Sequence, residues 1–420
     1  MLQQTSEKAP SRFRRVRYAG PYMDQNDFEA LTESLRSSFE TGWYGFGAKC
    51  IEFEQAFAKR VGTSYATFVN SGSSANLLAI ATLVASNKIT KGDQVITTAC
   101  TFPTVLNPSL LYGLKPVLVD VDLPSWSINQ EALKEAAESG AKLLILPHLN
   151  GIPHDMDSVN KLTSANSLIL LEDGCDALGS RFAGRNVGSF GELGTFSFYV
   201  AHHMTTGEGG MIVTNDKEFR DASSSLRDWG RTPIPLDSID QKRTLRYQTL
   251  TKDLPEDFES RYTYTHVGFN LKPLEMQGAW GLSQLDKLDE IIEKRKKNFQ
   301  SLTNNLAHYR DWLTLPEPHP KADVSWFWLP LIVKDEAPFK RRDIVGHLEN
   351  SGIETRPILA GNILKQPAYR KLDHKVIGEL TNTERILQNG FIVGVHPNLS
   401  NEEIEYMNET FHSFLKSIPR

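Results

Sequence analysis

The stretch ATFVNSGSSANLLAIATLVA, residues 66–85, passes from a strand-like run through a loop of serine, asparagine and glycine into a helical stretch. The same order recurs along the first half of the chain, where helical stretches include residues 76–85 and 130–138. The further strand-like runs are residues 95–98, 116–121, 143–147 and 167–171. Because these runs lack polar alternation and are followed by helices, they predict a mostly parallel sheet covered on both faces. The fold class is therefore α/β.

The remainder of the chain predicts a smaller second domain. A helix is expected at residues 24–39, where apolar residues fall at helical spacing behind an aspartate cap, and a second helix follows it. Residues 276–299 predict one long helix that bridges to the second domain, and residues 233–261 predict a long polar excursion. We expect an N-terminal tail at 1–20, a large domain at 21–290 and a small α+β domain at 291–420.

The composition is that of an ordinary globular protein. Of 420 residues, 40% are hydrophobic and 23% are charged, and the formal net charge is −5. Because there is no basic excess, nucleic acid is not an expected partner. No apolar run reaches the ~18 residues of a membrane span, and the polar start MLQQTSEKAP is not that of a secretory signal. Three widely spaced cysteines predict reduced thiols, so we expect a cytoplasmic protein.

Three strand ends place polar groups where a ligand could bind. NSGSSAN, residues 70–76, opens a helix, so its N–H groups and hydroxyls suit a phosphate; the alternative is an ordinary helix cap. LILLEDGCDALGS, residues 168–180, puts Asp173 at the carboxyl edge of the sheet. Asp173 either pairs with a protonated ring nitrogen or caps the next helix. Ser197 ends another strand, five residues before His202.

Together these segments resemble the sugar aminotransferase family of fold type I, which uses pyridoxal phosphate (PLP). The resemblance covers nearly the whole chain and is carried by GSSANL, ACTFPT, LEDGCDALGS, SFYVAHHMTTGEGG, GFNLKPLEMQGA and TRPILAGN. It implies a type I PLP-dependent transferase fold and a homodimer. The implied cofactor contacts are Gly72, Ser73 and Ser74 at the phosphate, Phe102 on the ring, Asp173 at the pyridine nitrogen, Asp176, Ser197, and Asn270 reaching the neighbouring subunit's cofactor. Arg231 and Arg356 are the implied contacts of a nucleotide sugar.

One residue departs from the family's pattern. The lysine that binds PLP covalently is expected three residues before the first threonine of TTGEGG, and this position is His202. No lysine occurs between Lys161 and Lys217. Within the family, histidine here marks a branch of sugar 3-dehydratases that act on 4-keto-6-deoxy nucleotide sugars. The resemblance implies that the cofactor is held without a covalent bond and used as pyridoxamine phosphate (PMP). His202 is then the catalytic acid and base, a role suited to an unperturbed pKa of about 6.5.

The cysteines bear on which dehydratase the chain resembles. Enzymes that act on CDP-sugars bind an iron–sulfur cluster through four cysteines, most of them shortly after a DWGR motif. Here DWGRTPIPLDSIDQKR, residues 228–243, contains no cysteine, and Cys175 stands alone. One thiolate cannot hold such a cluster, so we expect none. Local similarity in AHHMTTGEGG, SLRDWGR and IGELTNTERIL favours a CDP-sugar, whereas the missing cysteines match the enzyme for a GDP-sugar. The base stays open.

The histidine pair has simpler interpretations. Adjacent histidines point apart, so joint chelation of a metal is not expected. Two core histidines satisfied by hydrogen bonds would be the default in an anonymous loop, but the position before TTGEGG favours a catalytic His202. His203 is expected to be structural. The aromatic run Trp326, Phe327 and Trp328 is expected to be core rather than to contact the cofactor.

Three functions are compatible with these features. The first is a cluster-free 3-dehydratase whose PMP is regenerated by an amino donor such as glutamate. The second is a dehydrase that passes its intermediate to a separate reductase. The third is a catalytically silent relative that binds a nucleotide sugar. The combined set of Asp173, Ser197, His202 and Asn270 favours an active enzyme, and the missing lysine disfavours an ordinary aminotransferase.

Overall fold

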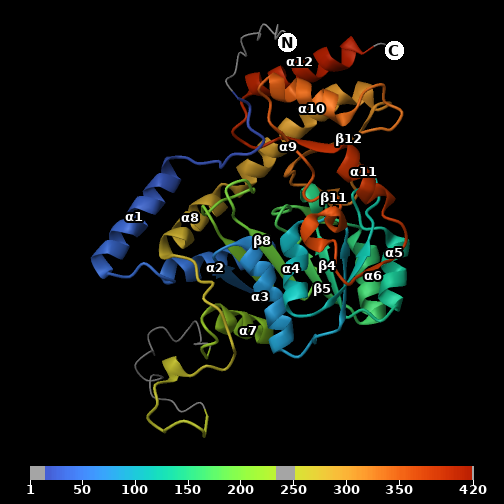
Figure 1. Ribbon diagram of the computed structural model, residues 1–420. Coiled ribbons are helices and arrows are strands. Elements are labelled where there is room, and N and C mark those ends of the chain that lie inside the picture. The colour runs from blue at the N-terminus through green and yellow to red at the C-terminus, as the bar shows by residue number, and fades with distance from the viewer. Residues whose placement is uncertain (1–14, 233–250, 419–420) are drawn as a thin grey trace, which may run out of the picture.

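The computed structural model describes residues 15–232 and 251–418 (Figure 1). Its main sheet has eight strands in the order β1-β9-β8-β5-β4-β2-β3-β14, and only β9 runs against the others. The mostly parallel sheet predicted from the sequence is therefore confirmed. The strands are β1 Tyr65–Val69, β2 Gln94–Thr98, β3 Lys115–Val119, β4 Leu143–Pro147, β5 Ile169–Asp173, β8 Leu193–Ser197, β9 Gly210–Thr214 and β14 Lys375–Val376.

Helices bury both faces of this sheet. Alternate residues along a strand point to opposite faces, and here both sets enter apolar cores, as in β2, where Val95 packs with α3 and Ile96 with α5 and α6. A third core lies between α2, α8 and the strands β1, β8 and β9. The helices of these layers are α2 Ala48–Val61, α3 Gly72–Ala85, α4 Pro103–Leu111, α5 Gln130–Glu138, α6 Met156–Asn166, α7 Lys217–Arg227 and α8 Glu275–Asp286.

A second, antiparallel sheet forms the core of the C-terminal part. Its strand order is β10-β12-β15-β13, and it packs with α9, α10 and α12 in one apolar cluster. Val16 near the N-terminus pairs with Ile353, so the start of the described chain joins this part. A small sheet, β11-β6-β7, lies apart from both. The bounds are β6 Arg181–Phe182, β7 Arg185–Asn186, β10 Leu313–Thr314, β11 Ala322–Asp323, β12 Trp328–Val333, β13 Thr355–Arg356, β15 Gly390–Gly394, α9 Leu288–Leu306, α10 Arg341–Asn350, α11 Thr381–Asn389 and α12 Asn401–Ser417.

The single long helix expected at residues 276–299 is wrong. Two helices, α8 and α9, meet at Lys287, whose backbone (φ −102°, ψ 5°) is not helical. The side chain of Lys287 forms ion pairs with Asp24 at 2.5 Å and with Asp27 at 2.7 Å. The break therefore coincides with a tertiary contact to the start of α1, which periodicity within 276–299 cannot reveal.

Helix α1, Gln25–Thr41, begins at the predicted aspartate cap, Asp24, but presents its apolar stripe outward. Phe28 is 62% exposed and Phe39 is 78% exposed, whereas Asp27 is fully buried. Figure 1 shows α1 at the edge of the molecule, away from the main sheet. The apolar stripe is therefore not covered by the described part of this chain.

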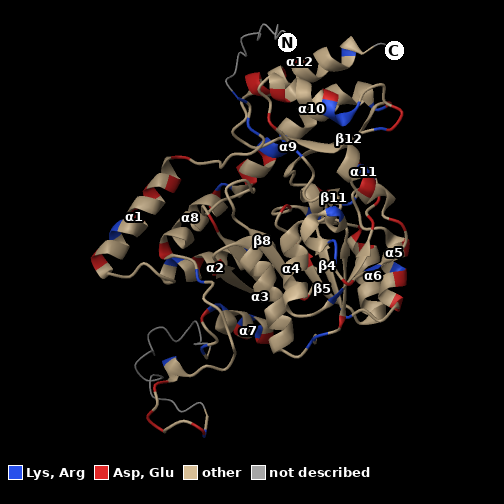
Figure 2. Ribbon diagram, viewed as in Figure 1, with Lys and Arg blue, Asp and Glu red and all other residues tan. Residues whose placement is uncertain are grey.

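Charge is distributed without a dominant patch. Figure 2 shows acidic and basic residues interspersed over the helices of the described chain rather than gathered by sign. Part of the expected polar excursion, residues 233–250, lies outside the described residues, and the remainder contains turns and the short 3-10 helix Ser260–Tyr262. In the described residues, no helix combines the length and apolarity needed to cross a bilayer.

Asp120, just after β3, joins the main sheet to α11. Its buried carboxylate accepts hydrogen bonds from the backbone N–H groups of Asn382 at 2.7 Å and Thr383 at 2.8 Å, and from the Thr383 hydroxyl at 2.6 Å. Leu380, the residue at the N-cap position of α11, gives no side-chain cap. Asp120 thus caps α11 from a distant part of the chain.

We expect Asp120→Ala to lower the free energy of unfolding by about 2–3 kcal/mol, because a helix cap is lost and buried donors are left unpaired. Urea unfolding followed by circular dichroism measures the change. Ser400→Ala is the matched control, since Ser400 caps the exposed start of α12 within its own segment. Equal losses in the two variants would contradict the tertiary role of Asp120.

Candidate active site

A cavity of about 340 Å³ lies at the carboxyl ends of β5 and β8. Ligands of open α/β sheets bind at this edge, because loops and helix starts converge there. Most of the residues expected from the sequence line this cavity: Gly72, Ser73, Phe102, Asp173, Asp176, Ser197, His202 and Arg356. The structure thus brings together side chains that are as far as 284 positions apart, from Gly72 to Arg356.

The N-terminus of α3 forms one wall of the cavity. Ser71 is the N-cap, and its hydroxyl accepts a hydrogen bond from the backbone N–H of Ser74 at 3.0 Å. Gly72 approaches β8 so closely that a Cβ atom on it would lie 2.4 Å from the Cβ of Ser197. The loop is therefore both a helix cap and a cradle, in which Gly72 and Ser73 reach the cavity and Ser74 does not.

Asp173 is held at the end of β5 by two hydrogen bonds. Its Oδ2 accepts from the side-chain amide of Asn76 at 2.8 Å, and its Oδ1 accepts from the backbone N–H of Cys175 at 2.9 Å. Asn76 is in turn bonded by the hydroxyl of Thr195 at 2.6 Å. Asn76 was not among the site residues expected from the sequence, although a buried asparagine in an otherwise apolar helix is a signal for such a role.

The neighbouring Glu172 points the other way and is structural. It is fully buried and accepts hydrogen bonds from the backbone N–H groups of Gly188, Phe190 and Gly191, while His148 lies 3.1 Å away. Because successive side chains of β5 point to opposite faces of the sheet, Glu172 and Asp173 face different surroundings. Asp173 lines the cavity, and Glu172 orders the loop before β8.

His202 lines the cavity from the loop between β8 and β9. Its imidazole stacks on the ring of Phe327 with a centroid distance of 4.8 Å and an interplanar angle of 10°. Its Nδ1 lies 3.9 Å from Oδ1 of Asp176, beyond hydrogen-bond distance, and is buried without a partner among the described residues. A ring nitrogen without a partner, 3.9 Å from a carboxyl oxygen, is placed to bind or exchange a proton.

The protonation of this pair differs from the expectation based on free side chains. Burial, reinforced by the positive charge of Arg295, lowers the pKa of His202 to about 3. Burial, together with the negative charge of Asp173, raises the pKa of Asp176 to about 8. The unperturbed pKa of about 6.5 therefore does not apply to His202 in the protein without ligands. Low solvation favours a neutral imidazole beside a protonated carboxyl group.

The expectation for the aromatic run that leads into β12 is only partly confirmed. Trp326, Phe327 and Trp328 are buried in the core of the C-terminal part, as expected. Phe327 and Trp328 also line the cavity, which corrects the expectation that they make core contacts alone. His203 is structural, as expected, because it is buried and its Nε2 contacts the carbonyl oxygen of Ser325 at 3.0 Å.

Three expected site residues lie outside the cavity: Ser74, Arg231 and Asn270. Arg231 lies over the ring of Trp229 and forms an ion pair with Asp228 at 3.5 Å. Asn270 is exposed, and its backbone forms an isolated β-bridge with Asp228. The adjacent Leu271 lies next to the loop before α3, because its carbonyl oxygen accepts a hydrogen bond from the backbone N–H of Asn70. In Figure 1 the yellow segment that leads toward Asn270 projects beyond α7.

The described residues contain no cluster of side chains suited to a metal ion. Of the three cysteines, Cys175 lines the cavity, while Cys50 and Cys100 are buried elsewhere. Burial raises the pKa of the Cys175 thiol well above its usual value, and the charge of Asp173 adds to this. Cys175 is therefore a protonated, unreactive thiol.

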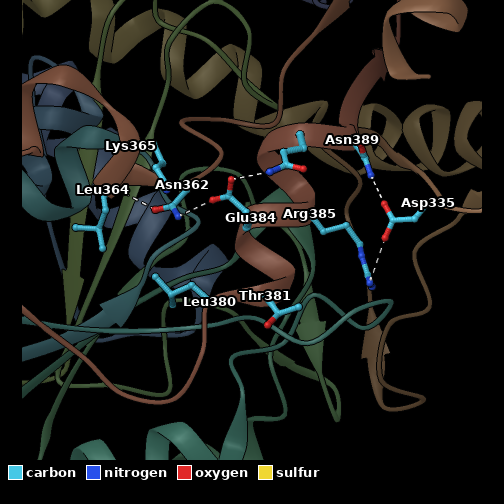
Figure 3. Close-up of a pocket in the computed structure, with 10 residues that line it drawn as sticks. Asp335, Asn362, Leu364, Lys365, Leu380, Thr381, Glu384, Arg385 and Asn389 are labelled. Carbon is cyan, nitrogen blue, oxygen red and sulfur yellow. Dashed lines mark hydrogen bonds and ion pairs between the residues drawn. The ribbon is translucent and has the colours of Figure 1, made fainter.

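A larger hollow of about 820 Å³ opens between α11 and the 3-10 helix Ile363–Lys365 (Figure 3). Figure 3 shows its polar side chains engaged with one another, as where Asn362 contacts Glu384 at 3.3 Å and Asn389 contacts Asp335 at 2.8 Å. None of the site residues expected from the sequence lines it. We therefore place the chemistry in the smaller cavity.

The residues of that cavity fit PLP or PMP. The start of α3 offers backbone N–H groups for a phosphate, and Gly72 leaves room that a Cβ atom would fill. The ordered carboxylate of Asp173 suits a protonated ring nitrogen, and Phe102 supplies an exposed aromatic face. Among the described residues that line the cavity, none is a lysine, so these residues provide only non-covalent contacts.

Comparison with known proteins agrees with this geometry. The DegT/DnrJ/EryC1/StrS aminotransferase family matches residues 22–412. The lipopolysaccharide biosynthesis protein RfbH of Salmonella typhimurium is 38% identical over 377 residues, covering 89% of this chain and 86% of the relative. GDP-4-keto-6-deoxy-D-mannose 3-dehydratase of Escherichia coli O55:H7 is 35% identical, covering 90% and 95% of the two chains.

A solved structure is similar over nearly the whole chain. It is GDP-4-keto-6-deoxymannose-3-dehydratase with a trapped PLP–glutamate geminal diamine, which is 32% identical with a TM-score of 0.85. The alignment covers 94% of this chain and 100% of that one. The fold is thus that of the PLP-dependent transferases of fold type I, as expected from the sequence.

The raised pKa of Asp176 predicts a pH-dependent stability for the protein freed of cofactor. The folded protein retains a proton that the unfolded chain releases above its ordinary pKa of 3.8, so this group's stabilising contribution falls as the pH rises from about 4 to about 8. Asp176→Asn does not titrate. Thermal unfolding should therefore show that the stability of the variant increases relative to that of the wild type from pH 5 to pH 8.

Asp289→Asn is the control for this experiment. A hydrogen bond from Arg60 lowers the pKa of Asp289, so that this carboxylate stays ionised above pH 5 whether the chain is folded or not. The difference in stability between Asp289→Asn and the wild type should not change over the same pH range. A constant difference for Asp176→Asn would show instead that Asp176 is ionised in the folded protein.

Proposed function

We propose that this chain, which belongs to the DegT/DnrJ/EryC1/StrS aminotransferase family, is a PMP-dependent dehydratase that removes the C3 hydroxyl of a 4-keto-6-deoxy nucleotide sugar. The observation that carries the proposal is the position of His202. It lines the cavity in the segment before TTGEGG, where the family's lysine is expected, and the described cavity residues include no lysine.

The similar proteins support this proposal. The relative from Escherichia coli O55:H7 and the solved structure are both named as 3-dehydratases of a 4-keto-6-deoxy sugar nucleotide. RfbH is named for lipopolysaccharide biosynthesis.

Each cavity residue then has a role in binding. Gly72, Ser73 and the start of α3 hold the cofactor phosphate, and Phe102 covers the ring. Asp173, fixed by Asn76, holds a proton on the ring nitrogen. PMP, when bound, supplies an amine that condenses with a ketone and a ring that accepts electrons. Arg356 at the cavity wall is placed to bind a phosphate of the nucleotide.

His202 and Asp176 accept and donate the protons of the reaction. The elimination needs a base to take up a proton and an acid to help the hydroxyl leave as water. A neutral imidazole meets the first need, and a protonated carboxyl group 3.9 Å from its Nδ1 holds a second proton. Because their environments shift the two pKa values in opposite directions, the pair supplies both functions at neutral pH.

The electrons come from the amino donor in this scheme. Replacing C–OH by C–H reduces the sugar by two electrons, and conversion of glutamate to 2-oxoglutarate and ammonia supplies them. One nucleotide sugar and one glutamate then give one 3-deoxy sugar, one 2-oxoglutarate and one ammonia. This balance needs neither a reductase nor an iron–sulfur cluster, and segment 228–243 contains no cysteine to hold a cluster.

We predict that purified protein with PMP, glutamate and a panel of 4-keto-6-deoxy nucleotide sugars forms 3-deoxy sugar, 2-oxoglutarate and ammonia in equal amounts under anaerobic conditions. His202→Asn should lower the rate at least about 100-fold, because general acid–base catalysis contributes that much. It should still bind PMP, which fluorescence of the bound cofactor measures. Formation of 3-deoxy sugar only after addition of a reductase and NADH would contradict the proposal.

We also propose that the active form is a homodimer in which Asn270 contacts the cofactor phosphate of the partner. Two observations support it. The apolar stripe of α1 is exposed, with Phe28, Leu35 and Phe39 at 62%, 49% and 78%, as expected for a surface that a second copy covers. Asn270 is exposed and outside the cavity of its own chain.

Hybrid dimers test the sharing of sites. Mixed after reversible dissociation, Asn270→Ala and His202→Asn chains should recover about a quarter of the wild-type activity, because half of the dimers are hybrids with one intact site each. A chain that carries both substitutions, mixed with wild type, is the control and should give no gain. No recovery in the first mixture would show that Asn270 acts within its own chain.

A further inference from the structure

Helix α9 carries a charged residue on its apolar face. The buried positions of the helix follow helical spacing, and Arg295, 1% exposed, lies among them. The other buried positions are Leu288, Ile291, Ile292, Asn298, Phe299, Leu302 and Leu306. A guanidinium group in the middle of such a face has to satisfy its donors inside the protein.

Two of the three guanidinium nitrogens of Arg295 donate to backbone carbonyl groups, and the third, Nε, is buried without a partner among the described residues. Nη2 donates to the carbonyl oxygen of His202 at 3.2 Å, and Nη1 donates to those of Phe327 at 2.8 Å and Trp326 at 3.3 Å. The first carbonyl belongs to the loop after β8, and the other two belong to the segment before β12. One side chain thus ties the loop of His202 to the ring on which the imidazole stacks.

Among the described residues, the positive charge of Arg295 has no ion-pair partner. None of the ion pairs in residues 15–232 and 251–418 includes it, and burial lowers the pKa of its guanidinium to about 9. A buried cation bonded only to neutral carbonyls is unfavourable for stability. Neutral donors would satisfy the same carbonyls without that penalty. We therefore expect the positive charge to have a role at the neighbouring site of His202.

We propose that Arg295 is a positioning residue for His202, fixing the backbone of His202 and of Phe327 through its hydrogen bonds, while its positive charge adds to burial in disfavouring a protonated imidazole. The inference rests on the proposed role of His202 as the proton-transfer group. The hydrogen bonds set the direction in which the imidazole faces the cavity, and the charge opposes a second positive charge nearby.

The other groups around His202 do not give the same effect. Asp176 and Asp173, from the end of β5, favour a protonated imidazole when ionised, as does the carbonyl oxygen of Cys175. His203 is buried and neutral, and Tyr199 meets the imidazole edge-on with a centroid distance of 6.4 Å. Among these neighbours, Arg295 is the permanent cation.

The experiment separates charge from hydrogen bonding. Arg295→Lys keeps a cation, whereas Arg295→Gln keeps a donor and removes the charge. In proteins labelled with ¹⁵N-histidine and loaded with PMP, the imidazole signal of His202 is assigned by its loss in His202→Asn. We expect no titration between pH 4.5 and pH 8 in the wild type or the lysine variant. In Arg295→Gln the pKa of His202 should rise by about one unit, so that protonation begins at the acid end of this range.

Two controls keep the result specific. Lys296→Met removes the next positive charge on α9, which forms an ion pair with Asp323, and should leave the signal of His202 unchanged. The pKa of His396 is lowered to about 4 by burial and by the charge of Arg295, and it should rise in Arg295→Gln. A shift of His396 without a shift of His202, or equal effects of the lysine and glutamine substitutions, would overturn the proposal.

Activity gives a separate readout. We expect kcat for sugar deoxygenation to fall about tenfold or more in Arg295→Gln and to recover in part in Arg295→Lys, with a smaller change in KM. The NMR shift does not depend on turnover. A shift of His202 in a protein that deoxygenates none of the sugars would therefore support the positioning role of Arg295 and count against the proposed function.

Discussion

The carboxylate of Asp173, held between the amide of Asn76 and the backbone of Cys175, is the interaction on which the site depends. It joins the end of β5 to α3, whose first turn forms the anion-binding wall of the cavity. Thr195 of β8 completes the chain of hydrogen bonds through Asn76. Three elements are therefore locked at one edge of the sheet, and a cofactor ring bound there meets a charge whose position is already set.

Exclusion of water then sets the chemistry of the cavity. His202 and Asp176 share the same poorly solvated space, and burial shifts their pKa values in opposite directions because each group loses its charged form. The result is an imidazole and a carboxyl group that are both neutral at physiological pH, as the proposed proton transfer requires. A lysine at position 202 would instead offer a nucleophilic amine, so in the proposed mechanism the change of one side chain replaces covalent capture of the cofactor by proton transfer.

Parts of the chain outside the main sheet complete the site. Phe327 and Trp328 lie at the start of β12, and Arg295 reaches both this segment and the loop of His202 from α9. The cavity thus lies where the C-terminal part packs on the sheet, and Asp120 secures the same junction at α11. In the proposed homodimer, the outward-facing stripe of α1 and the exposed Asn270 contact a second copy of the chain.

The sequence by itself determined the α/β class, the motif that opens α3, the strand end at Asp173 and the histidine at position 202, because each is a local pattern within about twenty residues. Only the tertiary structure decided the break at Lys287, the outward stripe of α1, the pKa values of His202 and Asp176, and the roles of Asn76, Phe327 and Arg295. These depend on partners far along the chain, such as Asp27 for Lys287 and His202 for Arg295. Helical periodicity identifies an apolar face but not what covers it, and a side chain's pKa follows from the solvent and charges around it, which sequence spacing does not specify.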